Sequence, residues 1–299
     1  MSLINEIEKI KKTKKAIILA HNYQNPEVQD IADFTGDSLE LSRIAADNDA
    51  EVIIFCGVHF MAESAYILSP QKKVILPDIT AGCPMADMAT AQDVMEMKKK
   101  NPDAAVVTYI NSSADVKAVS DICVTSANAV QIVNKLKENK IIFVPDRNLA
   151  HYVQRFTTKQ IIPWKGFCPT HDRFTKDELI AVRQKYPEAC VIVHPECRPE
   201  IIDMADKVLS TGQMVKNINT IPHKQVIVGT EEGMLHKLKK IAPEKEFILA
   251  SKGFICPNMK KITLEKILIA LTEEQPIVAV KEDTRIKAFS ALQKMLDLS

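Results

Sequence analysis

The sequence predicts an α/β protein of three homologous three-layer α/β/α sandwich domains, whose parallel sheets surround a pseudo-threefold axis. Two observations support this prediction. The first is a long internal repeat, and the second is the alternation of short apolar runs with helical patterns. Such alternation is typical of βαβ units, which build a parallel sheet with helices on its faces.

The repeat is marked by the dipeptide Cys-Pro, which occurs three times, starting at Cys83, Cys168 and Cys256. Seven residues after each cysteine comes a threonine: Thr90, Thr175 and Thr263. The copies lie roughly 85 to 88 residues apart, a period that is too long for a solenoid and fits a domain.

The repeat gives the expected domain bounds. We expect domains over residues 1–86, 87–171 and 172–262, and we expect residues 263–299 to fold back and complete the first domain. Three equivalent domains around one axis would bring three equivalent cysteines to one place.

Short, nearly continuous apolar runs predict strands that are buried on both faces, as in parallel sheets. These runs cover residues 17–20, 52–55, 74–77, 106–110, 141–144, 191–194, 226–229 and 247–250. Helical patterns between and around them cover residues 3–12, 91–100, 177–186 and 264–271. We expect a hydroxyl N-cap just ahead of each helix, at Ser2, Thr90, Thr175 and Thr263. Glu178, three residues after Thr175, predicts a capping box there.

Charge and cysteine content exclude several classes of protein. The 299 residues include 39 basic and 38 acidic ones, so nothing favours a nucleic-acid or membrane-surface partner. No apolar run approaches the ~20 residues that a membrane span needs. The seven cysteines include no CxxC pair, so we interpret them as thiols or metal ligands of a cytoplasmic protein rather than a disulfide framework.

The three Cys-Pro cysteines are candidate metal ligands. Three thiolates without an obvious fourth ligand leave an open coordination position, which suits a [4Fe–4S] cluster with one free iron. A zinc site remains open as an alternative, because spacing alone does not separate the two. The remaining cysteines have no counterpart in the other copies and are expected to be small buried hydrophobes: Cys56, Cys123, Cys190 and Cys197.

Polar residues follow the predicted strands at fixed offsets from the repeat markers. Nineteen residues after Ser2, Thr90 and Thr175 come His21, Tyr109 and His194. Alternate residues of an extended chain point the same way, so the partners two residues on should face the same cavity: Tyr23, Asn111 and Glu196. These groups could carry acid–base chemistry. The other histidines have no such support and stay unassigned: His59, His151, His171, His223 and His236.

Seventeen residues after His21, Tyr109 and His194 comes a hydroxyl in each copy, just ahead of an expected helix: Ser38, Ser126 and Thr211. Three helix starts around one cavity would suit a substrate with several carboxylate or phosphate groups. Simple N-capping by each hydroxyl is the alternative.

Several segments, taken together, resemble the quinolinate synthase family. They are ILAHNYQ, DIADFTGDSL, FMAE, CPMA, YINS, TSANAV, PDRNLA, HPEC, STGQM, GTEEGMLHKL and NMKKITLE, and they span essentially the whole chain. The resemblance implies a triangular arrangement of three α/β sandwich domains with a central [4Fe–4S] cluster. It also implies that iminoaspartate and dihydroxyacetone phosphate condense to quinolinate, phosphate and water.

The resemblance implies roles for the residues already singled out. Cys83, Cys168 and Cys256 would bind the cluster. His21, Ser38, Tyr109, Asn111, Ser126, His194, Glu196 and Thr211 would line the substrate site. Tyr23, His21, His194 and Glu196 would move protons, and an enzyme that generates iminoaspartate would be a functional partner.

Three other functions stay open from the residues alone. One is an aconitase-like hydro-lyase that uses an open iron on another hydroxy acid. The second is a non-enzymatic iron–sulfur sensor, and the third is a zinc lyase. A sensor function is disfavoured because the sequence has no DNA-binding motif or basic face, and because it would leave the repeated polar residues unexplained.

Overall fold

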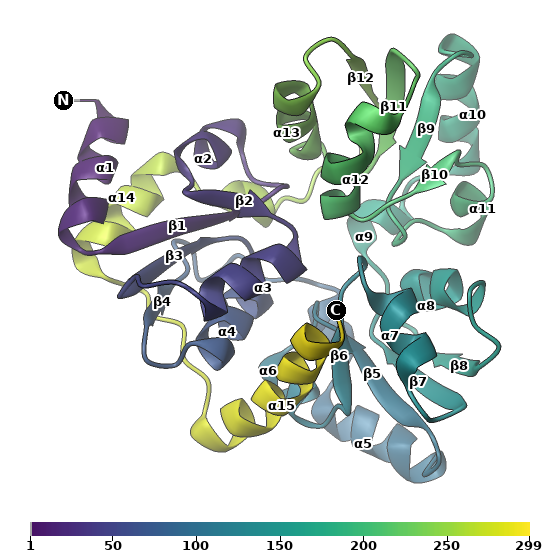
Figure 1. The fold of residues 1–299 in the computed structure, drawn as a ribbon, viewed down its shortest axis with the longest axis horizontal. Helices are drawn as coiled ribbons and strands as arrows, with labels where there is room; N and C mark the ends of the chain where they lie inside the picture. Colours follow the sequence, from purple (N-terminus) through teal and green to yellow (C-terminus); the bar gives the residue numbers. More distant parts are fainter. Residues whose placement is uncertain (1) are drawn as a thin grey trace.

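The computed structural model describes residues 2–299, which form three four-stranded sheets with helices packed around them (Figure 1). The first sheet has the order β2-β1-β3-β4, with strands Phe34–Gly36, Ala16–His21, Val52–Cys56 and Lys73–Ile75. The second has the order β6-β5-β7-β8, with strands Ile122–Val124, Ala105–Tyr109, Lys140–Val144 and Gln160–Pro163. The third has the order β10-β9-β11-β12, with strands Lys207–Val208, Cys190–Val193, Gln225–Gly229 and Glu246–Leu249.

Every pairing between these strands is parallel, and the strand order is the same in each sheet. The predicted α/β class with three parallel sheets is therefore confirmed. The three sheets are grouped around the middle of the molecule (Figure 1).

Helices cover the sheets in the pattern expected for βαβ units. Around the first sheet lie α1 (Leu3–Thr13), α2 (Pro26–Ile31), α3 (Ser38–Ala46) and α4 (His59–Leu68). Around the second lie α5 (Ala91–Lys100), α6 (Ala114–Ala118), α7 (Ala129–Lys135) and α8 (Arg147–Gln154). The third has α9 (Pro169–Asp172), α10 (Lys176–Lys185), α11 (Pro199–Ile202), α12 (Thr211–Asn217) and α13 (Met234–Ile241). The chain ends in α14 (Leu264–Glu273) and α15 (Glu282–Leu298).

The predicted N-caps are confirmed. The side chains of Ser2, Thr90, Thr175 and Thr263 each accept a backbone N–H from the first turn of α1, α5, α10 and α14. Thr175 and Glu178 form the expected capping box. A hydroxyl that accepts one of the otherwise unpaired N–H groups of a first turn fixes where the helix starts.

An aspartate holds the edge of each sheet in the same way. Asp33, Asp121 and Asp206 directly precede the short strands β2, β6 and β10. Each carboxylate accepts the backbone N–H of a residue in the neighbouring strand, at 2.8 Å from Ile18, 2.7 Å from Val106 and 2.7 Å from Val191. This bond fixes the register of a strand that is too short to be predicted from an apolar run.

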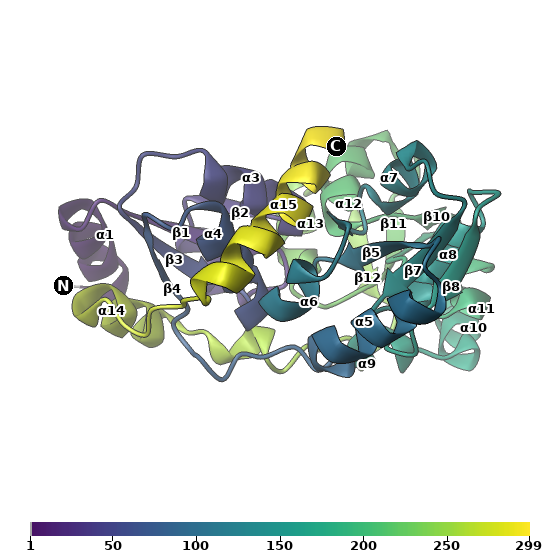
Figure 2. The same ribbon diagram turned by 90° about the horizontal axis from the view of Figure 1, so that it is seen from below.

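The C-terminal segment packs on two parts of the molecule. Helix α14 lies against α1, and Val278 N donates to Val74 O beside β4 (2.8 Å). Helix α15 runs along α6 and β6 and also contacts α4 (Figures 1 and 2). The domain bounds 1–86, 87–171 and 172–262, with 263–299 completing the first domain, stay a prediction. Within residues 2–299, no helix is both long and apolar enough to cross a bilayer.

An ion-pair cluster ties the end of α14 to the first sheet, and it predicts how stability depends on pH. Glu274 ends α14 in the left-handed conformation and pairs with Lys14 (2.6 Å) and with Lys73 of β4. Hydrogen bonds from Lys14 and Lys73 lower the pKa of Glu274 to about 2. The folded state therefore binds a proton at this carboxylate less readily than the unfolded state does, so the pair stabilises the fold above the ordinary pKa and is lost in acid.

We expect Glu274→Gln to lower the melting temperature at pH 7 by a few degrees at most, because such partly exposed pairs contribute about 1 kcal/mol or less. The difference between wild type and variant should shrink as the pH falls from about 4.5 toward about 2. Thermal unfolding at pH 7, 4 and 3 measures it. Glu273→Gln is the matched control, since no ion-pair partner of Glu273 occurs within residues 2–299. A difference that grows on acidification would contradict the assignment.

Candidate active site

A central cavity of about 250 Å³ is lined by loops that follow strands of all three sheets. Every residue that the repeat singles out as a site residue lies on its wall: His21, Tyr23, Ser38, Cys83, Tyr109, Asn111, Ser126, Cys168, His194, Glu196, Thr211 and Cys256. The carboxyl ends of parallel strands are the usual position of ligand sites in α/β folds. The structure thus brings these twelve side chains together, and their individual roles stay predictions.

The three Cys-Pro cysteines share one part of this wall. Cys83, Cys168 and Cys256 are partly exposed, whereas the four cysteines outside the repeat are buried, as predicted. Burial raises the pKa of Cys83 to about 12, and the nearby Cys256 and Glu196 add to this effect. Burial also raises the pKa of Cys168, and Glu196 and Cys83 add to it. The three thiols thus line one cavity and influence one another's pKa.

The backbone of each cysteine's own loop lowers the pKa of its thiol, against the larger effect of burial. The N–H groups that do so belong to the residues three positions on, Ala86, His171 and Met259. Backbone N–H groups aimed at sulfur stabilise the thiolate form. The same arrangement in all three copies suits three thiolates that bind one metal centre.

The hydroxyls of the repeat are not helix caps. Asp37 caps α3, Ser210 caps α12, and Asn128 is the residue ahead of α7. Ser38 and Thr211 are instead the first residues of their helices, and Ser126 lies two positions before Asn128. The capping alternative is therefore wrong, and the three hydroxyls lie on the cavity wall beside helix starts.

A chain of hydrogen bonds connects the acid–base candidates. Tyr109 donates its hydroxyl to Glu196 Oε1 (2.6 Å), and Glu196 Oε2 lies 2.8 Å from His171 Nδ1. His171 Nε2 lies 2.8 Å from Thr230 Oγ1, which lies 2.6 Å from the hydroxyl of Tyr23. Tyr23 and Glu196, which come from different sheets, are thus joined by two residues that the repeat did not single out.

Burial sets the protonation state of these groups. It lowers the pKa of His21 and of His194 to about 3, so both rings are neutral near pH 7. It raises the pKa of Tyr23 and of Tyr109 well above the ordinary value. Burial alone would also raise the pKa of Glu196, but attraction to His194 and His171 and hydrogen bonds from His171 and Tyr109 lower it below its ordinary value. Of the three carboxyl groups on the cavity wall, Asp37, Glu196 and Glu231, Glu196 is the one whose pKa is lowered, and it lies beside neutral histidines and tyrosines.

His171 and Thr230 are the residues that the sequence analysis missed. His171 lies one helical turn after Cys168 on α9, so both side chains reach the cavity wall from the same side. Thr230 directly follows β11, another strand that ends beside the cavity. His171 was unassigned because it has no counterpart in the other two copies.

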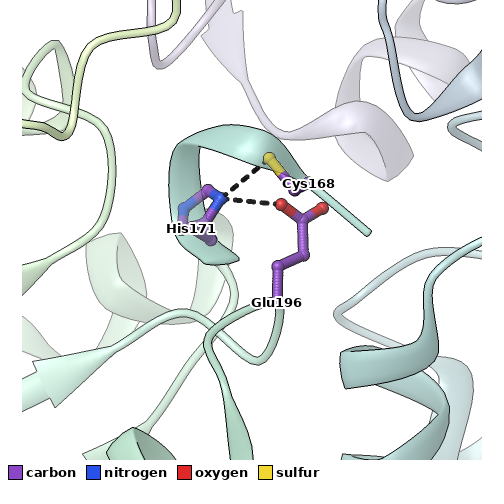
Figure 3. A group of neighbouring side chains, drawn as sticks. All are labelled: Cys168, His171 and Glu196. Atoms are coloured by element: carbon purple, nitrogen blue, oxygen red, sulfur yellow. Dashed lines mark hydrogen bonds and ion pairs between the residues drawn. The ribbon is translucent and has the colours of Figure 1, made fainter. Parts of the chain in front are cut away.

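Three of these side chains could hold a metal ion (Figure 3). One ligand atom each of Cys168, His171 and Glu196 lies within 4.8 Å of the other two. Figure 3 shows Cys168 and His171 on the short helix α9 and Glu196 reaching toward them from the loop after β9.

Similarity to known proteins decides the family. The family model for the quinolinate synthetase A protein matches residues 5–297. The quinolinate synthase of Desulforudis audaxviator is 51% identical over 297 residues, which cover 99% of this chain and 98% of that protein. That of Geotalea uraniireducens is 54% identical over 292 residues, covering 98% of this chain and 96% of that protein.

The chain belongs to the quinolinate synthase family. The quinolinate synthase of Methanosarcina barkeri is likewise 52% identical over 294 residues, covering 98% of this chain and 97% of that protein. The resemblance drawn from the sequence segments is therefore confirmed, and the cavity belongs to a member of an enzyme family.

A buried ion pair holds the third cysteine loop of this family member in place. The side chain of Glu231 is fully buried, and its Oε1 lies 3.0 Å from Lys260 Nζ. Glu231 also accepts the backbone N–H of Cys256 (3.1 Å), and Lys260 donates to the carbonyl of Tyr23 (2.8 Å). Removing one partner of such a pair leaves an uncompensated buried charge.

We expect Lys260→Met to lower the free energy of unfolding by about 3 kcal/mol, because Glu231 would stay buried without its cation. Urea unfolding of wild type and variant measures the change. Lys252→Met serves as the control, since Lys252 is exposed and makes no ion pair within residues 2–299. A loss no larger than that of the control would show that the pair is not structural.

Proposed function

We propose that the protein condenses iminoaspartate with dihydroxyacetone phosphate to give quinolinate, phosphate and two waters, with a [4Fe–4S] cluster bound by Cys83, Cys168 and Cys256. The observation that supports this most strongly is the shared cavity, in which the three equivalent cysteines lie beside the polar residues of all three copies. Membership of the quinolinate synthase family supports the same reaction. The thiols favour a reducing compartment, and we propose a cytoplasmic location.

The residues present fit the cluster. Three partly exposed thiols line the same cavity, and a backbone N–H three residues after each lowers the pKa of its thiol. With three protein thiolates, a bound [4Fe–4S] cluster has one iron without a protein ligand, and this iron supplies Lewis-acid chemistry for the removal of water.

The hydroxyls and Asn111 would hold the anionic groups of the substrates. Ser38, Ser126 and Thr211 lie at helix starts on the cavity wall, where backbone N–H groups and the helix dipole favour an anion. Asn111 lines the cavity, and its Oδ1 is buried with no hydrogen-bond partner within the described part of the chain. A buried unpaired amide oxygen is costly unless a ligand or water satisfies it.

Proton movement would follow the hydrogen-bond chain between Tyr23 and Glu196. Condensation, ring closure and aromatisation all require protons to leave carbon or nitrogen and to reach oxygen. Glu196, the cavity carboxylate whose pKa is lowered, would accept a proton, and Tyr109 would steady the resulting carboxyl group through its 2.6 Å bond. Thr230 and His171 would pass a proton between Glu196 and Tyr23. Neutral His21 and His194 would contact the substrate without adding charge.

A product assay tests the proposal directly. Protein prepared without oxygen, with full cluster content, should form quinolinate from chemically generated iminoaspartate and dihydroxyacetone phosphate. An enzyme that produces iminoaspartate should replace the chemical source, which would establish the expected functional partner. Failure to form quinolinate at full cluster content, together with dehydration of another hydroxy acid, would favour the aconitase-like alternative.

The cysteines give a prediction about metal content. Replacing Cys83, Cys168 or Cys256 with Ser should each abolish stable iron binding, because two thiolates hold a [4Fe–4S] cluster poorly. Replacing Cys56, Cys123 or Cys190, which are buried away from the cavity wall, should leave the iron content near that of wild type. Iron and acid-labile sulfide per chain are the measurement. An essential cysteine in the second group and a dispensable one in the first would refute the assignment.

The hydroxyls give a prediction about catalysis. Ser38→Ala, Ser126→Ala and Thr211→Val should each lower kcat/KM roughly ten- to a hundred-fold, because a hydrogen bond to a charged group contributes about 1.5–3 kcal/mol. The melting temperature should change little, since none of the three caps a helix. Ser210→Ala removes a real cap and is the contrasting control: it should lower stability by about 1 kcal/mol. Unchanged kinetics in all three hydroxyl variants would sink the proposal.

A further inference from the structure

Three different metal-binding groups meet at one corner of the cavity. His171 Nδ1 lies 2.8 Å from Glu196 Oε2 and 3.2 Å from Cys168 Sγ (Figure 3). One nitrogen, one sulfur and one carboxylate oxygen form the mixed set of donors from which protein zinc sites with three ligands are built.

The spacing is close to what zinc requires. With metal–ligand bonds of about 2.0 Å to nitrogen and oxygen and about 2.3 Å to sulfur, tetrahedral zinc separates nitrogen from oxygen by about 3.4 Å and nitrogen from sulfur by about 3.6 Å. The observed separations of 2.8 and 3.2 Å are those of hydrogen bonds. The side chains therefore need to move apart by only about half an ångström to admit the ion.

The outer contacts of the site are also in place. Thr230 binds His171 Nε2, which leaves Nδ1 free to point its lone pair at a metal. Tyr109 donates to Glu196 Oε1, which leaves Oε2 free. Metal-binding histidines and carboxylates usually have such partners, because these orient the ligand atoms. The side chains of His171 and Glu196 are only 1% and 5% exposed, so they are held in position before any ion arrives.

We propose that the chain without its cluster binds one Zn²⁺ ion through Cys168, His171 and Glu196, with the fourth position open to the cavity. Binding replaces the thiol proton of Cys168, which passes to the solvent. Because both centres would use the thiolate of Cys168, we infer that bound zinc excludes the iron–sulfur cluster; this exclusion alone rests on the proposed function. Zinc and cluster assembly thus compete for one residue.

Zinc titration of the iron-free, full-length protein tests the site. The protein should be reduced, freed of iron by a chelator under anaerobic conditions, and titrated against a chromophoric zinc indicator. We expect one tightly bound ion per chain in wild type. His171→Ala should weaken zinc binding at least about 100-fold, since mutation of a residue that merely orients a metal ligand already lowers metal affinity 10- to 100-fold. His151→Ala, a change to an exposed histidine outside the cavity, should leave zinc binding unchanged.

Two variants separate this site from the three-cysteine centre. Cys83→Ser should keep the zinc affinity of wild type and lose iron, whereas His171→Ala should lose zinc and keep iron. Glu196→Gln checks the third ligand if His171→Ala proves unstable in thermal unfolding, and it too should weaken zinc binding. Zinc affinity lost in Cys83→Ser, or retained in both His171→Ala and Glu196→Gln, overturns the proposal.

Whether bound zinc prevents cluster assembly is tested by a separate experiment. Reconstitution with iron and sulfide should fail in zinc-loaded wild type and should succeed in His171→Ala incubated with the same zinc. Full iron uptake by zinc-loaded wild type would overturn the exclusion. If even zinc-free wild type takes up no iron, the proposed cluster fails, while the zinc titration still decides the zinc site.

Discussion

The strands of each sheet end at the same central cavity, and the geometry of the site depends on this shared direction. Because strand order and register repeat, the loops after β1, β5 and β9 reach the cavity at equivalent points. The aspartate bonds to Ile18, Val106 and Val191 keep that register at each sheet edge. A one-residue slip in one sheet would turn its polar residues away from the cavity and its apolar residues toward it.

The three copies contribute different chemistry to this common frame. The cysteine loops are alike, since a backbone N–H three residues on lowers the pKa of each thiol. The strand ends are not alike: two residues after His21, Tyr109 and His194 come Tyr23, Asn111 and the carboxylate Glu196. Only the second cysteine loop carries a histidine, His171. Burial raises the pKa of the other two cavity carboxyls, Asp37 and Glu231, and keeps His21 and His194 neutral, whereas the pKa of Glu196 is lowered, so Glu196 is the ionised carboxylate among the acid–base residues.

The sequence allowed the buried strands, the hydroxyl N-caps and the twelve cavity residues to be predicted, because each rests on a local pattern or a fixed offset. The short strands β2, β6 and β10 have only two or three residues each, too few for an apolar run to reveal them, and they form because they pair with a longer neighbour. The sequence did not show whether Ser38 and Thr211 cap their helices. In the structure the residue before each is the N-cap, Asp37 for α3 and Ser210 for α12. His171 was missed because its partners, Thr230 and Glu196, are distant in sequence.

Two glycines allow the third part of the chain to pack closely against the first part beside the cavity. A Cβ on Gly233 would lie 2.7 Å from the backbone of Tyr23, and one on Gly212 would lie 2.4 Å from the carboxylate of Asp37. Any other residue at these two positions would displace the backbone of Tyr23 or the side chain of Asp37, which precedes Ser38. Beside these contacts, Asn22 Nδ2 donates to Thr211 Oγ1 (3.3 Å), which joins the loop after β1 to the start of α12. The repeat supplies equivalent side chains, and these two glycines let the sheets approach closely enough for the side chains to act on one ligand.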